Sequence, residues 1–159
     1  MSRLTINLVR VLLVVILLGT VVAQVWFFPL LAQELAITFP EVAWLRVPML
    51  VVVILAILAV QVSLLAVWKL LAMVERDSVF SESAFGWVNV IIGAAVFDTV
   101  LVAGVNWFMG YQVHANPPGL MLMLLALSVG GATFALLMVL MKGLLRKASE
   151  MTTELSQVI

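Results

Sequence analysis

Four long apolar runs follow one another along the chain, with short polar stretches between them. They cover residues 8–31, 47–74, 84–109 and 120–142. Each exceeds the roughly 20 apolar residues that an α-helix needs to cross the hydrocarbon core of a bilayer. Lipid offers no hydrogen-bond partner to backbone groups, and a helix satisfies these groups internally. The pattern predicts an all-α, polytopic membrane protein, a four-transmembrane-helix bundle in which residues 1–159 form a single membrane domain.

The first run and the connection after it carry two prolines. The run is too long for a signal peptide, whose apolar region has about 7–15 residues, so we expect an uncleaved anchor. Pro29 is expected to kink or stop the helix near the end of this run. The connection 33–46 contains Pro40, which suits the first turn of a helix. Two interpretations stay open for it: a short amphipathic helix at the outer membrane surface, or an ordered loop.

The polar stretch before the third run has the residues of a helix start. Ser81 is expected to act as the N-cap, with Glu82 in the first turn. Phe80 and Phe85 occupy the two positions of a hydrophobic staple. These residues predict a tight, defined turn.

Residues 143–159 are expected to extend the fourth helix beyond the membrane on the cytoplasmic side. Apolar residues recur there at helical spacings and form a stripe: Leu144, Ala148, Met151, Leu155 and Val158. Arg146 and Glu150 form an i,i+4 pair on another face. A helix that lies on an anionic membrane usually carries Lys or Arg along its polar face, but here Glu150 and Glu154 follow the basic residues. We therefore expect this amphipathic helix to dock on protein, either a second copy or the inner loop.

The basic residues set the expected orientation. Only Arg46 falls on the side of the connection 33–46. The opposite side carries Arg3, Arg10, Lys69, Arg76, Lys142, Arg146 and Lys147. Because Lys and Arg concentrate in cytoplasmic loops, both termini are predicted to be cytoplasmic.

Composition narrows the function classes. Apolar residues make up 65% of the chain and charged residues 10%, whereas a soluble domain is nearer half and a quarter. The formal net charge is zero, so we expect no direct binding to nucleic acid. With no cysteine, the chain has no thiol nucleophile and no thiolate metal site.

One acidic residue lies in the middle of an apolar run. Asp98 and Gln61 fall at about the same depth, counted from the midpoints of their runs, and Ser128 and Thr133 join them in an intramembrane polar layer. A charged side chain at this depth costs at least ~2.5–3.5 kcal/mol, so Asp98 should face the bundle or water. We expect it to be largely protonated and to hydrogen-bond Gln61 or Ser128. The layer has two interpretations: hydrogen bonding between helices, or a proton or cation site in a small transporter.

Other reactive groups are sparse. His114 is the only histidine and has no cysteine, acid or second histidine nearby, and Met121 and Met123 are ordinary apolar fillers. No Ser-His-acid set falls in one compartment. We expect no enzymatic activity, no catalytic residue, no metal and no cofactor.

Four stretches resemble a known family. They are FPEVAWLRVP at 39–48, VQVSLLAVWKLLAMV at 60–74, VFSESAFGWVNVIIGA at 79–94 and GLLRKASEMTTELSQVI at 143–159. They resemble the bacterial domain-of-unknown-function family 2975 of small four-helix membrane proteins, most closely its actinobacterial branch. The resemblance implies a bacterial cytoplasmic membrane and a neighbouring cytosolic helix-turn-helix regulator. It brings no catalytic residues. Relatives often have an acid where this chain has Asn89, and Asp98 is not part of the family pattern.

Two functions are therefore expected from the sequence. The first is a non-enzymatic membrane protein for interaction or regulation, which associates with itself or with a cytosolic protein such as a helix-turn-helix regulator. Its candidate cytoplasmic surface comprises Arg76, Asp77, Phe80, Glu82, Phe85, Asn89, Met151 and Leu155. The alternative is a small proton- or cation-coupled transporter or channel subunit that uses Asp98 and Gln61.

Overall fold

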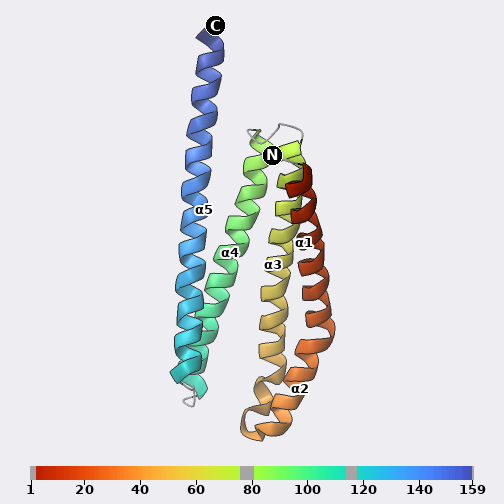
Figure 1. The fold of residues 1–159 in the computed structure, drawn as a ribbon. Helices are drawn as coiled ribbons and strands as arrows, with labels where there is room; N and C mark the ends of the chain where they lie inside the picture. Colours follow the sequence, from red (N-terminus) through yellow and green to blue (C-terminus); the bar gives the residue numbers. More distant parts are fainter. Residues whose placement is uncertain (1–2, 76–80, 114–117, 159) are drawn as a thin grey trace. The chain divides into compact units, whose positions relative to one another are not determined.

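The computed structural model describes residues 3–75, 81–113 and 118–158, and every element in them is a helix (Figure 1). Four helical segments are long and apolar enough to cross a membrane: Arg3–Thr38, Pro40–Glu75, Glu82–Tyr111 and Pro118–Leu155. The predicted all-α fold of a multi-pass membrane protein is confirmed. The chain divides into two compact units, Met1–Trp68 and Lys69–Ile159, and each is described by itself.

In the first unit, α1 (Arg3–Val22) continues through a π-helical turn (Ala23–Phe27) into α2 (Phe28–Thr38). A 3₁₀ helix (Pro40–Leu45) then leads into α3 (Arg46–Glu75), which runs on into the second unit. The helix of the first run therefore extends beyond the predicted residue 31. In the connection 33–46, the short helix that begins at Pro40 is 3₁₀ rather than α, and its Leu45 is buried.

Pro29 does not stop the first helix as expected. The backbone N–H of Phe28 donates to the carbonyl of Ala23, five residues back, which is the wide hydrogen bond of a π-helix. Proline has no N–H, and its ring crowds the carbonyl four residues before it. A wider turn ahead of Pro29 makes room for the ring, and the helix then continues to Thr38.

The second unit is an antiparallel pair of helices. It comprises α4 (Glu82–Phe108), a π-helical turn (Met109–Val113) and α5 (Pro118–Val158), and α5 has 41 residues. Figure 1 shows α5 continuing past the start of α4. At about 1.5 Å per residue, α5 is roughly 60 Å long, about twice the thickness of the hydrocarbon core.

The start of α4 differs from its expected cap. Ser81 has the extended backbone of an N-cap residue, and its carbonyl accepts hydrogen bonds from the N–H groups of Ala84 and Phe85. Its side chain makes no capping hydrogen bond, and its hydroxyl instead lies 2.8 Å from the hydroxyl of Ser83. The predicted side-chain cap is therefore wrong, although the helix begins at the expected residue. Phe80, the first residue of the predicted staple, lies outside the described residues.

Few side chains are buried within the described structure. The buried apolar residues are Ile6, Leu13, Leu45, Ala66, Ala84, Ile91 and Ala135. Long runs of leucine, valine and isoleucine remain exposed along all four segments. A soluble protein rarely exposes large contiguous apolar surface, whereas lipid covers such surface readily.

Candidate functional site

Three side chains form a polar cluster between α1 and α3. The side-chain amide of Gln61 donates to Thr20 Oγ1 at 3.3 Å and to Gln24 Oε1 at 3.1 Å. The side-chain amide of Gln24 in turn donates to the backbone carbonyl of Ile54 at 3.3 Å. These bonds join the two helices of the first unit within their apolar spans.

Gln24 was not predicted as part of the polar layer. It lies in the π-helical turn, four residues after Thr20, so the two side chains share a face of the first helix. The spacing of four residues between Thr20 and Gln24 is the feature of the sequence from which this cluster could have been predicted. The cluster gives Gln61 the hydrogen-bonding role that the sequence suggested, but its partners are Thr20 and Gln24 instead of Asp98.

The α4–α5 contact follows a heptad-like pattern. Between Pro118 and Leu155, the residues of α5 that are not fully exposed recur mostly at alternating spacings of four and three: Leu124, Ser128, Gly131, Ala135, Met138, Lys142 and Ser149. We call this row the α5 seam. Such spacing places every member on the side of a helix that faces one neighbour.

Gly131 marks a close approach of the two helices. A Cβ atom added to it would lie 2.5 Å from Oγ1 of Thr99. No real Cβ atom tolerates that distance, so α5 can lie this close to α4 only with glycine here. By contrast, a Cβ atom at Gly130 would meet nothing within 4 Å.

Asp98 is part-buried in α4, one residue from this contact. Its Oδ1 is buried and has no hydrogen-bond partner in the described part of the chain, and the same is true of Oδ1 of Asn106. The expected bond between Asp98 and Ser128 is not formed, and the Ser128 hydroxyl donates to the carbonyl of Leu124 in its own helix. Thr133 is exposed and donates to Val129, so it lies off the α5 seam.

Asn89, placed by the sequence on the candidate interaction surface, is bound within the second unit. The ammonium group of Lys142 donates to its Oδ1. This bond joins α4 to the α5 seam and places the charge of Lys142 near the start of α4. Asn89 therefore helps to hold α4 against α5.

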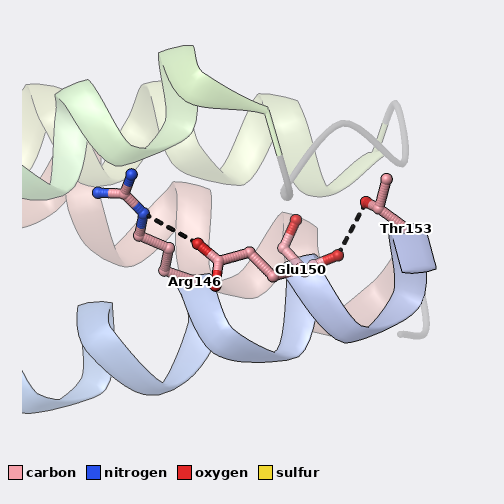
Figure 2. A network of polar contacts seen from close by, with 4 residues as sticks. Arg146, Glu150 and Thr153 are labelled. Carbon is pink, nitrogen blue, oxygen red and sulfur yellow. Dashed lines mark hydrogen bonds and ion pairs between the residues drawn. The ribbon is translucent and has the colours of Figure 1, made fainter.

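The end of α5 carries the most exposed of the predicted interaction residues. Met151 and Leu155 are each 67% exposed. The predicted pair is confirmed, with Arg146 Nε 3.4 Å from Glu150 Oε1, and Figure 2 shows it beside Thr153. Both side chains are well exposed, so the pair adds little to stability.

Of the remaining predicted residues, the structure describes Glu82 and Phe85, both in the first turn of α4. Glu82 is exposed and Phe85 is partly buried, whereas Arg76, Asp77 and Phe80 fall outside the described residues, as does His114. No group of three or more His, Cys, Asp or Glu that could hold a metal ion occurs in the described ranges.

Comparison with known proteins identifies a family and no function. The model of the family described as protein of unknown function (DUF2975) matches residues 30–159, most of the chain, and confirms the resemblance inferred from the sequence. No curated protein and no solved structure matches this chain.

Proposed function

This chain belongs to the family of proteins of unknown function DUF2975, and we propose that it is a non-enzymatic protein of the bacterial cytoplasmic membrane that acts through protein–protein contacts. The observation that carries this proposal is the apolar stripe near the end of α5, which continues past the start of α4. The stripe comprises Leu144, Ala148, Met151, Leu155 and Val158.

The register of the two helices leaves the end of α5 without a partner residue in the described part of α4. Thr99 lies against Gly131, and Asn89 binds Lys142, so Glu82 at the start of α4 is level with about Ser149. Residues 150–158 extend past this level by about 13 Å. Among them, Met151 and Leu155 are exposed and need a cover that α4 does not provide.

The stripe and the α5 seam lie on different faces. At about 100° per residue, Met151 is turned by roughly 200° from Gly131. The stripe is therefore not a continuation of the contact with α4. It is a second surface of the same helix.

We propose a second copy of the chain as the occupant of this surface. Spacings of four and three are those of a coiled-coil seam, which needs at least two helices. Two copies in one membrane present their α5 helices in parallel and at the same height, and the membrane raises their effective concentration. Glu150 and Glu154 disfavour an anionic lipid surface as the cover.

The natural absence of cysteine allows a direct test of this contact. Met151→Cys is expected to form a disulfide-linked dimer in native membranes under mild oxidation, because its side chain lies in the proposed interface. Thr153→Cys is the matched control, since Thr153 is turned by about 160° from Met151 on the same helix. Dimers are read on a non-reducing gel.

Comparing the Met151→Cys and Thr153→Cys variants shows whether a second copy covers the stripe. Preferential cross-linking at position 151 supports the second copy. Equal cross-linking at both positions, or none at either, overturns it. A cross-link from position 151 to a different cytosolic protein would also overturn the second copy and would retain a docking function.

The cytoplasmic position of both termini is a further proposal. It is supported by the basic residues at one end of each unit: Arg10 lies 5.8 Å from the ring centre of Trp68, while Lys142 lies near the start of α4. A membrane-impermeant maleimide added to intact cells is expected to label Glu41→Cys and to spare Thr153→Cys. After the cells are opened, both variants should react. Labelling of Thr153→Cys in intact cells would reverse the orientation.

Transport through Asp98 and Gln61 is the second proposal. It is supported by the buried Oδ1 of Asp98, which lacks a partner among the described residues. Gln61 supports it less, since its amide is bound to Thr20 and Gln24. Proton flux into proteoliposomes that is lost in Asp98→Asn would support transport, and equal flux in both proteins would remove it.

A further inference from the structure

Two side-chain oxygens of α4 are buried and have no hydrogen-bond donor in the described part of the chain. They are Oδ1 of Asp98 and Oδ1 of Asn106, both without a hydrogen-bond partner in the described part of the chain. Eight residues separate them, which is about 12 Å along a helix and about 80° around it, so both lie on one broad face of α4. Each unsatisfied buried oxygen requires a physical explanation, such as a bound water or ion.

Two hydroxyl groups of the described α4 and α5 at this level donate to backbone carbonyls of their own helices. The hydroxyl of Thr99 donates to the carbonyl of Ala95, and that of Ser128 donates to the carbonyl of Leu124. Residues 118–141 of α5 contain no charged side chain. The nearest cation of α5 is Lys142, which binds Asn89, about 13 Å along α4 from Asp98. Glu82, the other acid of α4, is still farther away.

The buried apolar residues of this contact all lie on one side of Asp98. Ala84 and Ile91 precede it in α4 and are 2% and 6% exposed, and Ala135 of α5, 6% exposed, is level with about residue 95. Between Asp98 and Asn106, no described residue of α4 is buried. Among the described residues, the buried apolar side chains therefore lie towards the Lys142 end, whereas a polar side chain, Asn106, lies towards the other end.

We propose that Asp98 is a proton-binding site that water reaches from the Asn106 end of the α4–α5 contact. A proton makes the carboxyl group neutral, which removes the cost of a charge within the membrane. A chain of several waters from Asn106 to Asp98 would supply hydrogen to both oxygens, since buried waters commonly bond otherwise unsatisfied polar groups. This inference rests on the second proposed function, transport through Asp98. It adds that the ligand is a proton and that the proton enters from the Asn106 end of α4.

Two carbodiimides test the site in the full-length protein in liposomes. An apolar carbodiimide, dicyclohexylcarbodiimide, adds to a protonated carboxyl group without a leaving group and ends as a stable N-acylurea, so the peptide gains the mass of the reagent. Peptide mass spectrometry is expected to find this adduct on Asp98, with less labelling as the pH rises. Absence of the adduct at every pH would overturn the proposal.

The side of entry needs a water-soluble carbodiimide and a pair of variants. Asn106→Leu is expected to lose most of the labelling of Asp98 by this reagent while keeping the labelling by the apolar one. Thr133→Val, which changes an exposed residue of α5 that lies off the α5 seam, should keep both. Equal labelling of Asp98 in the two variants would overturn entry from the Asn106 end.

Two further measurements test the identity of the ligand independently of the transport function. Asp98→Asn should remove a protonated-carboxyl band from the infrared spectrum, and its persistence would overturn the assignment. Protection of Asp98 by sodium ions at constant pH would replace the proton with a metal cation as the ligand. A pH-dependent adduct without proton flux would remove transport and leave the proton site in place.

Discussion

Gly131→Ala is expected to destabilise the α4–α5 pair by about 1–3 kcal/mol, the usual cost of overpacking a tight contact. The new Cβ atom would lie 2.5 Å from Oγ1 of Thr99, a β-branched side chain with little freedom to move within a helix. Either α5 moves away from α4, or the Thr99 hydroxyl gives up its bond to Ala95. Both responses weaken the contact.

The matched control for this change is the neighbouring glycine. Gly130→Ala adds the same methyl group into open space and should leave stability nearly unchanged. Thr99→Ala removes the clashing oxygen, so the double variant Gly131→Ala, Thr99→Ala should be about as stable as Thr99→Ala alone. Unfolding in sodium dodecyl sulfate, followed by circular dichroism, measures each difference. Equal losses in the two glycine variants would contradict the assigned close approach.

Gln61→Leu is expected to lower the stability of the first unit by about 1 kcal/mol. It removes two hydrogen bonds between α1 and α3, and bonds of this kind contribute about 0.6 kcal/mol each on average in membrane proteins. It also leaves Oε1 of Gln24 without the donor that the structure shows. The same unfolding measurement on the full-length chain detects the loss.

Ser63→Ala is the control for Gln61→Leu. Ser63 lies two residues away in α3, but its hydroxyl donates to the carbonyl of Ala59 in the same helix. Its removal breaks no bond between helices and should change stability by less than about 0.5 kcal/mol. If the two variants were equally stable, the hydrogen bonds of Gln61 would have no part in holding α1 to α3.

The features that the sequence predicted well depend on long or local patterns. Runs of 20 or more apolar residues define a spanning helix almost without regard to neighbours, because lipid imposes the same demand on all of them. The Arg146–Glu150 pair is set by helix periodicity alone. The family likeness rests on several separate stretches and extends over residues 30–159.

The features that the sequence did not predict depend on which polar groups contact each other in the fold. Depth placed Gln61 beside Asp98, but depth does not determine which helix faces which, and Gln61 found Thr20 and Gln24 instead. Ser128 donates to the carbonyl of Leu124 one turn away in its own helix, a local bond that depth alone does not predict. Pro29 was expected to kink or stop the helix. The π-helical turn before it makes room for the proline ring without ending the helix.

The unbroken length of α5 has a mechanical consequence. From Gly131 to Val158 it is one helix, about 40 Å long, with no proline after Pro118 and no irregular turn. A change of about 10° in its tilt at Gly131 would move Val158 by roughly 7 Å. Any event that alters how closely α5 lies against Thr99 is thus amplified into a visible displacement of the stripe, so α5 can act as a lever between the membrane interior and the water beyond it.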